Sequence, residues 1–495
     1  MTSENQTKIP AKGGRRGVLK TLIDLVFIVF CGGISMFYLY IGNLKELQFV
    51  EIVPMLLIFS GLGWIIYLIL RFTLKTPRKG ALLSGIAMAI LTNAGMLTGA
   101  LGYIVILIIS VLLIAAILFV FIRFVKESIA GKIEFILAGV LAALILFNVA
   151  ISIPQYIENK RLSDEATAKA ASLEKITVPA KYANGDAKKP NFYIFVFDEL
   201  AGTQCMKEVF NYDNTGFYND MRKLGFTVSD DCTNYKQFTM EALSGLFHMD
   251  YVFDYDTDGQ LACREQFKNA RFFSLMKEMG YNLYETESAG EVNFQPRIDY
   301  GLNPEYSSTE DGYSTLDVIL GRSLFAPLVN AMKIIPADGD FYEKILTYYT
   351  LPESYSYQNA MTFTYLCNPH APFLFDANGN RVDDANRMNW SDQKYFLGQY
   401  EYTCGRIVKT MDSIIKNDPD AIIIVLSDHG VKPNKYLWNG PATNYEQSTD
   451  TFFAVYTGGR DDLGDITGLC GANVLRTILN KEYGFQLDMT GPPAN

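Results

Sequence analysis

Histidine and tryptophan are scarce in this chain, and its cysteines form no informative pattern. Only three histidines and three tryptophans occur among 495 residues, so an imidazole placed beside a carboxylate at a strand end carries information. The seven cysteines lack the spacing of a disulfide framework or a zinc ribbon, and we expect free, buried thiols. Excess basic charge is also lacking, because the formal net charge is −10, which argues against nucleic acid as a partner.

Long apolar runs, by contrast, fill the front of the chain. A helix needs roughly 20 apolar residues to cross a bilayer, and five runs approach or exceed that length. They cover residues 18–41, 50–71, 81–99, 102–122 and 134–153. Five in succession favour a membrane bundle over the core of a large soluble protein. A cleaved signal peptide fits poorly, because the first run is too long and further runs follow it.

Basic residues predict the orientation of this bundle. They gather before the first run, between the second and third, and between the fourth and fifth, which places all three clusters on one side. The clusters are Lys8, Lys12, Arg15, Arg16 and Lys20; Arg71, Lys75, Arg78 and Lys79; and Arg123, Lys126 and Lys132. The positive-inside rule then puts residues 1–17 in the cytoplasm and the chain after residue 153 outside it. We expect a multi-pass protein of the plasma membrane.

The rear of the chain reads as a linker followed by one large domain. Residues 154–190 predict a polar helix over the membrane surface and then turns around Pro179 and Asn184-Gly185. From 191 to 495, short apolar runs alternate with amphipathic stretches, which predicts a mostly parallel sheet with helices on both faces, an α/β fold. The predicted strands are 192–197, 361–366, 421–426 and 452–456, and the clearest helices are 215–224, 270–279 and 395–416.

Carboxylates and an imidazole follow two of these strands. Asp198-Glu199 comes directly after the first strand, and Ser427-Asp428-His429-Gly430 after the third. Adjacent carboxylates at a buried strand end need a cation or strong donors to stay ionised. Asp198, Asp428 and His429 would offer oxygen and nitrogen ligands that suit Zn²⁺ or Mn²⁺ better than Ca²⁺. Capping of the following helices by the carboxylates remains open as the alternative.

Thr239 is a candidate reacting group. Loop-like residues precede it and an apolar helical pattern follows, so that it lies about where the N-cap of a helix belongs. A hydroxyl there would feel the positive end of the helix dipole, which also favours an anionic phosphoryl group. On local sequence alone, a role for Thr239 only as the helix cap is favoured.

These motifs together resemble those of a known family. Phe195-Val196-Phe197-Asp198-Glu199, the Thr239 segment, Asn368-Pro369-His370-Ala371-Pro372-Phe373 and Leu426-Ser427-Asp428-His429-Gly430 occur in the order of sulfatase-like enzymes of the alkaline phosphatase superfamily. Five spans before an outer domain resemble lipoteichoic acid synthase and the phosphoethanolamine transferases. The resemblance implies an alkaline phosphatase-like domain in which Asp198, Thr239, Asp428 and His429 bind one Mn or Zn ion.

The resemblance also implies residue roles and leaves some of them open. Thr239 would be the nucleophile, and His370 would bind phosphate or donate a proton to the leaving oxygen. Glu199 could replace Asp198 as a ligand, because relatives commonly have Glu there. His248 could bind metal or substrate, although a packing role is commoner for such a histidine. Lys432 could reach substrate oxygens or lie solvated at the surface.

The implied activity is transfer of a phospholipid headgroup, glycerol phosphate or ethanolamine phosphate, to a surface glycan or glycolipid through a covalent Thr intermediate. True sulfatases carry a Cys/Ser-x-Pro-x-Arg sequence, and none occurs here, which favours phosphoryl over sulfate chemistry. A phosphate- or sulfate-ester hydrolase using the same site and a non-catalytic surface scaffold remain as alternatives.

Overall fold

The computed structural model describes most of the chain, and the chain divides into two compact units. The described residues are 13–45, 47, 49–97, 102–183, 188–286, 300–301, 323–325, 340–350, 357–383, 386–431, 445–460, 463–464, 466–469 and 471–491. The first unit comprises residues 1–158 and 315–334, and the second comprises 159–314 and 335–495. We call them the helical unit and the outer domain.

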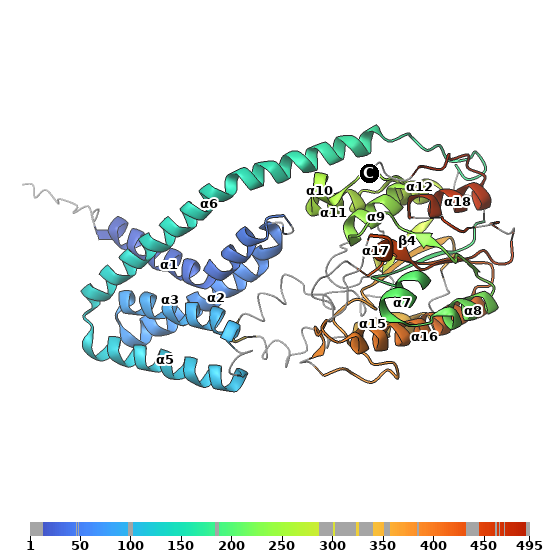
Figure 1. Ribbon diagram of the computed structural model, residues 1–495. Helices are drawn as coiled ribbons and strands as arrows, with labels where there is room; N and C mark the ends of the chain where they lie inside the picture. The colour runs from blue at the N-terminus through green and yellow to red at the C-terminus, as the bar shows by residue number, and fades with distance from the viewer. Residues whose placement is uncertain are drawn as a thin grey trace, which may run out of the picture. The chain divides into compact units, whose positions relative to one another are not determined.

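The helical unit contains a helix for each of the five predicted spans (Figure 1). These are α1 (Gly13–Gly42), α2 (Phe49–Leu74), α3 (Pro77–Asn93) with the 3₁₀ turn η1 (Ala94–Leu97), α5 (Tyr103–Phe124) and α6 (Glu127–Ser172). Of the described helices, α1, α2, α5 and α6 are long and apolar enough to cross a membrane. Helix α3 has only 17 residues and packs against α1 and α2, so that a fifth span stays a prediction.

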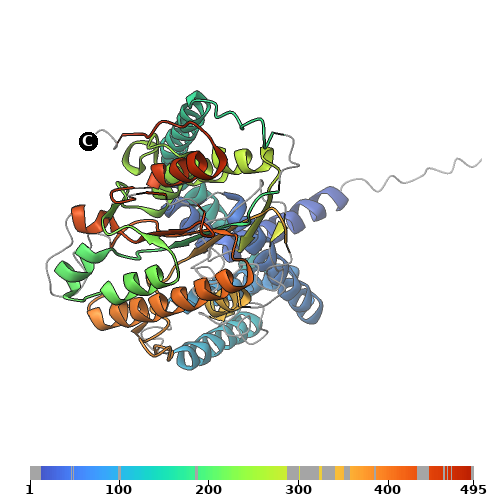
Figure 2. The ribbon, with the colours of Figure 1, turned by 90° about the vertical axis from the view of Figure 1, so that its right-hand side faces the viewer.

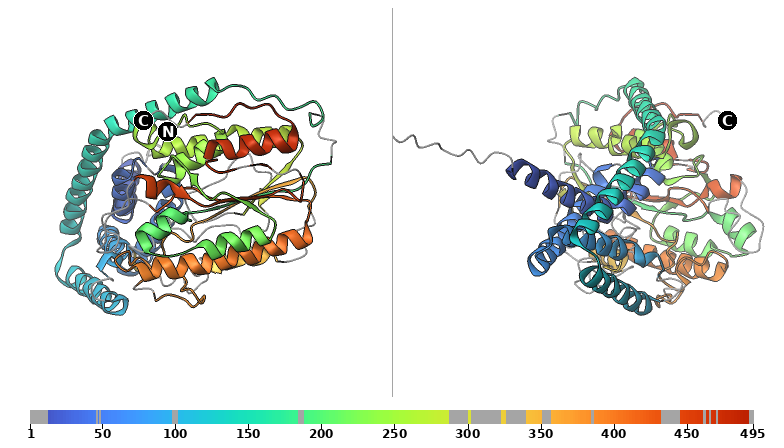
Figure 3. Two further views of the ribbon diagram at one scale, coloured as in Figure 1. Left: turned by 45° about the vertical axis from the view of Figure 1, so that its right-hand side comes forward. Right: turned by 90° about the vertical axis from the view of Figure 1, so that its left-hand side faces the viewer.

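Helix α6 differs from the sequence prediction at its carboxyl end. The predicted fifth span and the predicted surface helix form one continuous helix of 46 residues (Figure 3). Beyond residue 158 the helix belongs to the outer domain, where Ala166 is fully buried and Lys169 pairs with Asp258. The polar half of α6 therefore packs on protein, because it carries a small apolar surface of its own that the charge pattern concealed.

The outer domain is built on a seven-stranded sheet in the order β2-β9-β7-β1-β6-β4-β5, beside a two-stranded sheet, β3-β8. The strands are β1 (Phe192–Phe197), β2 (Thr227–Val228), β3 (Cys232–Thr233), β4 (Asn282–Thr286), β5 (Tyr300–Gly301), β6 (Ala360–Leu366), β7 (Ile422–Ser427), β8 (Asp450–Thr451) and β9 (Phe453–Tyr456). Strands β7, β1, β6, β4 and β5 run parallel, and β9 pairs antiparallel with both β7 and β2. The prediction of a mostly parallel sheet is confirmed.

Helices cover both faces of this sheet (Figures 1 and 2). The described helices of the outer domain are α7 (Thr203–Phe210), α8 (Thr215–Lys223), α9 (Thr239–His248), α10 (Tyr255–Asp258), α11 (Gln260–Lys268), α12 (Arg271–Glu278), α15 (Asp340–Tyr348), α16 (Gln393–Asn417), α17 (Tyr445–Thr449) and α18 (Gly471–Tyr483). Along the fully buried β1, Phe192, Ile194 and Val196 face a core with α9, α11, α12 and α18. Alternate residues face a second core with α7, α8, α15 and α16. The α/β fold class is thereby confirmed.

The four predicted strands coincide with β1, β6, β7 and β9 within one residue at each end. Strand β4 was not predicted, because its sequence Asn-Leu-Tyr-Glu-Thr lacks the apolar content of the other inner strands. It becomes a strand by pairing with β6, a contact that is remote in sequence.

Candidate active site

The sheet brings the two acidic motifs to one edge. Strands β1 and β7 are parallel neighbours, and their last residues, Phe197 and Ser427, lie opposite each other in register. The N–H of Asp428 donates to the carbonyl of Phe197 at 3.3 Å. Asp198 and Asp428 consequently leave the sheet side by side at its carboxyl edge, where parallel α/β sheets place their ligands.

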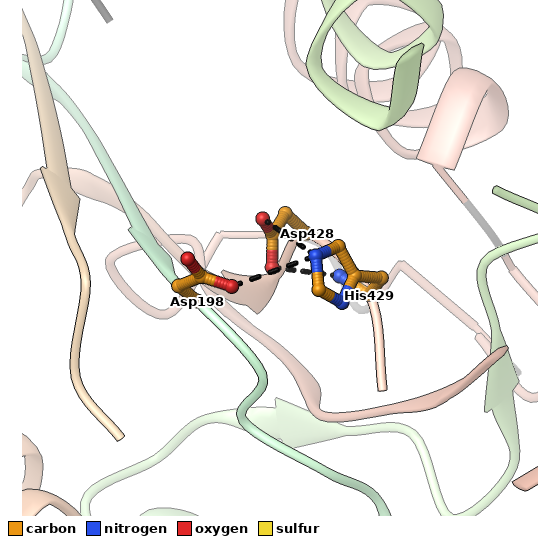
Figure 4. A group of neighbouring side chains, drawn as sticks. All are labelled: Asp198, Asp428 and His429. Carbon is orange, nitrogen blue, oxygen red and sulfur yellow. Dashed lines mark hydrogen bonds and ion pairs between the residues drawn. The ribbon is translucent and has the colours of Figure 1, made fainter. Parts of the chain in front are cut away.

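Asp198, Asp428 and His429 form a compact buried group (Figure 4). One ligand atom from each lies within 4.8 Å of the others. Asp198 Oδ1 and Asp428 Oδ2 each lie 3.5 Å from His429 Nε2. All three residues are at most 4% exposed. Two carboxylates in one buried place repel each other strongly unless a cation lies between them.

Hydrogen bonds set the orientation of the imidazole and of Asp428. His429 Nδ1 lies 2.7 Å from the carbonyl oxygen of Gly430 and donates to it, so that the other ring nitrogen, Nε2, faces the carboxylates. Asp428 Oδ1 accepts the N–H of Glu199 at 3.2 Å and that of His429 at 2.8 Å. Its other oxygen, Oδ2, is the one turned toward the imidazole.

This donor set fits a metal ion. Two carboxylate oxygens and one imidazole nitrogen, buried and pre-oriented, are ligands that Zn²⁺ and Mn²⁺ accept. Each ligand is fixed by a bond to a further group, as is usual around metal centres. For Asp198, that group is the hydroxyl of Tyr365, which donates to Oδ2 at 2.8 Å.

Thr239 joins this group from another part of the chain. It is the first residue of α9, and Phe238 occupies the N-cap, one residue before the predicted position. The Thr239 hydroxyl oxygen lies 3.3 Å from His429 Nε2, and the residue is 4% exposed. The hydroxyl thus faces the acidic group while lying at the positive end of the α9 dipole. Its position differs from that of a residue that only caps the helix.

The loop after β6 places His370 at the same edge. The backbone N–H of His370 donates to the carbonyl of Asp198 at 3.2 Å. Its Nδ1 lies 2.6 Å from the carbonyl of Ala371 and carries the proton, so that Nε2 is the basic nitrogen. The ring packs edge-on against Trp390, with 5.3 Å between centroids. The half-buried His370 is therefore held beside the first acidic motif.

The other three predicted residues have different positions. Glu199 is buried and adopts a left-handed conformation (φ 59°), but the three-residue group found among the described residues does not include its carboxylate. His248 lies nine residues after Thr239, at the far end of α9 and about 13 Å along its axis. Its Nε2 donates to the carbonyl of Gln266 at 2.8 Å, which corresponds to the packing role. Lys432 lies outside the described residues.

Three supporting residues were not predicted. Tyr365 bonds Asp198, and the Asn234 side-chain amide donates to the carbonyl of Asp428. Gln399 is fully buried, and its amide donates to the carbonyls of Pro369, His370 and Pro372 at 2.8–3.2 Å. Gln399 could have been recognised, because it lies three residues after Phe396 and so falls on the apolar face of an amphipathic helix. Tyr365 and Asn234 gave no comparable signal, because buried tyrosines and loop asparagines are common.

Comparisons with known proteins give low-scoring structural neighbours. No protein-family model and no curated protein matches the chain. Similar solved structures include the integral membrane lipooligosaccharide phosphoethanolamine transferase A of Neisseria meningitidis, at 13% identity and a TM-score of 0.39, covering 93% of this chain and 95% of that one.

Two further neighbours cover the outer domain. The C-terminal periplasmic domain of EcEptC from Escherichia coli, in complex with Zn, has 10% identity and a TM-score of 0.40, over 62% of this chain and 87% of that one. The C-terminal periplasmic domain of phosphoethanolamine transferase EptC from Campylobacter jejuni has 14% identity and a TM-score of 0.39, and the match covers 62% of this chain and 92% of that one. The neighbours thus include phosphoethanolamine transferases, the enzyme class that the sequence resemblance names. At these identities and scores, residue roles are not carried over to this chain.

Proposed function

We propose that the outer domain transfers a phosphoryl-linked headgroup from a phospholipid to a hydroxyl acceptor, with Thr239 as the nucleophile. The observation that carries this proposal is the 3.3 Å approach of the Thr239 hydroxyl to His429 Nε2, within a buried group of two carboxylates. Thr239 is not the N-cap of α9, because Phe238 occupies that position. It is poised beside ligands suited to a divalent cation, at a helix end that favours anions.

Asp198, Asp428 and His429, with the Thr239 oxygen, would hold one Zn or Mn ion. Such an ion, when bound, lowers the pKa of the Thr239 hydroxyl and offsets negative charge on phosphoryl oxygens. Tyr365 keeps the Asp198 carboxylate in place through its 2.8 Å hydrogen bond. The N–H groups of Glu199 and His429 do the same for Asp428.

The reaction has two displacements. In the first, the Thr239 oxygen, its proton released to solvent, forms a bond to phosphorus, and the bond from phosphorus to the diacylglycerol oxygen breaks. A water molecule, or His370 once its Nε2 also carries a proton, protonates the departing oxygen. In the second, the oxygen of an acceptor hydroxyl forms the new bond to phosphorus and gives up its proton to solvent. The bond from phosphorus to the Thr239 oxygen breaks, and that oxygen takes up a proton, which restores the threonine. A glycan or glycolipid of the cell surface supplies that hydroxyl.

The helices of the first unit support a membrane location for this chemistry. Four of the described helices are long and apolar enough to cross a bilayer. We propose the orientation that the basic clusters indicate, with the N-terminus in the cytoplasm and the outer domain outside it, in the plasma membrane. Attachment to the membrane would raise the effective concentration of the lipid donor at the site.

Replacement of the nucleophile tests the proposal. Thr239→Ala should lower headgroup transfer from a labelled phospholipid at least about 10³-fold without unfolding the protein, since a missing nucleophile removes both displacements. Thr239→Ser, which keeps the hydroxyl, is the matched control and should retain measurable transfer. Mass spectrometry of the wild type after exposure to lipid should show a headgroup phosphate on Thr239.

Other outcomes separate the alternatives. Full transfer by Thr239→Ala would refute the mechanism. Labelled headgroup free in solution, with none joined to an acceptor, would identify a hydrolase. Absence of bound Zn and Mn in elemental analysis of the purified protein would favour a non-catalytic scaffold.

A further inference from the structure

A cavity of about 600 Å³ lies at the basic end of the helical unit. It is formed by α1, α3 and the start of α6, and its charged lining residues are Lys20, Arg78, Glu127 and Lys132. Phe135 and Ile136 of α6 line the same cavity. It thus combines charged and apolar walls, and every lining residue belongs to the helical unit.

The charges in this cavity favour an anion. The Arg78 guanidinium is engaged, because Nη1 binds Asp24 Oδ1 at 2.6 Å and Glu134 Oε2 at 3.0 Å. Glu127 is partly engaged too, since its carboxylate accepts the backbone N–H of Arg78 at 3.3 Å. Within the described part of the chain, Lys20 and Lys132 have no ion-pair partner. Besides Arg78 and its two carboxylate partners, the cavity therefore presents two ammonium groups and one carboxylate.

A separate apolar groove of about 290 Å³ lies next to this cavity. It runs between α1 and α6 and shares Phe135 with the cavity. The other lining residues are Leu22, Ile23, Val26 and Phe30 of α1 and Ala138, Gly139 and Ala142 of α6. From Phe135 to Ala142 the groove extends about 10 Å along the helix, away from the charged end. The small residues of α6 give the groove its depth.

We propose that cavity and groove together bind one anionic phospholipid. Its phosphate lies between Lys20 and Lys132, and an acyl chain occupies the groove beneath Phe135. Basic pockets between membrane helices on the cytoplasmic side bind anionic headgroups by this chemistry. Free phosphate would fill only the cavity and leave the adjacent apolar groove unexplained. With the orientation proposed above, this lipid belongs to the cytoplasmic leaflet and is distinct from the donor of the outer domain.

Native mass spectrometry of the full-length protein in detergent tests the headgroup end. All measurements use a Thr239→Ala background, so that no lipid is consumed. Palmitoyl-oleoyl phosphatidylglycerol should be retained about tenfold more tightly than the matching phosphatidylcholine. The double variant Lys20→Gln/Lys132→Gln should lose that preference, because both ammonium groups are gone. Lys126→Gln, in the same basic region but outside the cavity lining, should leave it unchanged.

Filling the groove tests the acyl-chain end. A side chain at Gly139 would meet no atom within 4 Å of its Cβ, so Gly139→Leu should occupy the groove without disturbing the fold. It should weaken retention of both lipids several-fold. Gly61→Leu on α2 is the matched control, because its Cβ also meets nothing within 4 Å and it does not line the groove.

The proposal is overturned if the double lysine variant keeps the phosphatidylglycerol preference, or if Gly139→Leu behaves like Gly61→Leu. Displacement of the lipid by soluble glycerol 3-phosphate at comparable concentration would identify a free-phosphate site instead. Failure of headgroup transfer in the outer domain leaves these binding results unaffected.

Discussion

Each of the two units of this protein buries a pair of carboxylates, and the pairs differ in the side chain that faces them. In the helical unit, Asp24 and Glu134 both contact the guanidinium of Arg78, at 2.6 and 3.0 Å. In the outer domain, Asp198 and Asp428 face the imidazole of His429, at 3.5 Å each. The first pair faces a permanent cation of the chain's own, whereas the second faces a ring nitrogen.

This difference separates a structural cluster from a candidate metal centre. A guanidinium stays protonated and fills the space between two carboxylates. A neutral imidazole adds a third ligand atom and leaves the positive charge to come from an ion. One carboxylate oxygen each of Asp24 and Glu134 is therefore bound to Arg78, whereas ligand atoms of Asp198, Asp428 and His429 lie within 4.8 Å of one another.

The largest expected effect comes from a carboxylate of the outer pair. Asp428→Asn should release the bound Zn or Mn and lower headgroup transfer at least about 10³-fold, because the ion stabilises charge in the transition state. Metal content by elemental analysis and transfer of a labelled headgroup measure this. Asp24→Asn, the corresponding change in the helical unit, should leave the metal content unchanged. Equal metal content in the two variants would contradict the comparison.

Removal of the built-in cation should mainly affect stability. Arg78→Met leaves Asp24 and Glu134 buried without their guanidinium, which should destabilise the protein by about 3–5 kcal/mol. Chemical denaturation of the detergent-solubilised protein measures this. Arg71→Met is the control, because Arg71 donates to the hydroxyl of Tyr67 at 2.9 Å and its loss should cost about 1 kcal/mol. Similar losses in both variants would make the Arg78 cluster incidental.

A third buried carboxylate extends the comparison to pH. Asp450 accepts the backbone N–H of Cys205 at 2.6 Å, and burial raises its pKa from 3.8 to about 6. The folded state thus holds this proton more tightly than the unfolded state. The resulting stabilisation is complete below about pH 4 and is lost as pH rises through about 6, by up to about 3 kcal/mol.

Asp450→Asn should remove this part of the pH dependence, since the amide keeps an acceptor for Cys205 and carries no charge. Denaturation of wild type and variant between pH 4 and pH 8 measures it, and the wild type should lose stability relative to the variant. Parallel curves would show that Asp450 does not titrate in that range.

The smallest effect concerns the group that orients Asp198. Tyr365→Phe removes the hydrogen bond to Oδ2 and should weaken metal binding about 10- to 100-fold, which is typical for such supporting residues. Competition with a chelator measures the affinity. Tyr349→Phe is the control, because that hydroxyl bonds Thr364 at 2.8 Å and not Asp198. An unchanged affinity in Tyr365→Phe would exclude the positioning role.

Much of the outer fold could be predicted from local pattern, and the exceptions have physical causes. Strands β1 and β7 consist almost entirely of apolar and aromatic residues because both of their faces are buried. Strand β4 escaped prediction because its polar residues are compensated by pairing with β6. The predicted helix of the linker is the second half of α6, and its packing on the outer domain through Ala166 was not predicted.

Some residues of the candidate site could also be predicted from local sequence, whereas the contacts of others depend on segments remote in sequence. Asp198, Asp428 and His429 were recognisable because each follows a buried strand. Thr239 was placed within one residue of its position at the start of α9. The environment of His248, at the other end of that helix, depends on the carbonyl of Gln266 from α11. The same holds for Tyr365, whose contact with Asp198 requires two strands to be neighbours.

The sequence alone determined where strands end, which helices are apolar enough for a bilayer and which side chains have suitable chemistry, because burial imposes a periodicity that is visible locally. The tertiary structure decided which of those side chains meet. Residues 198, 239 and 429 approach within a few ångströms only because parallel pairing aligns the ends of β1 and β7 and α9 begins beside them. That convergence depends on contacts remote in sequence, which no local pattern encodes.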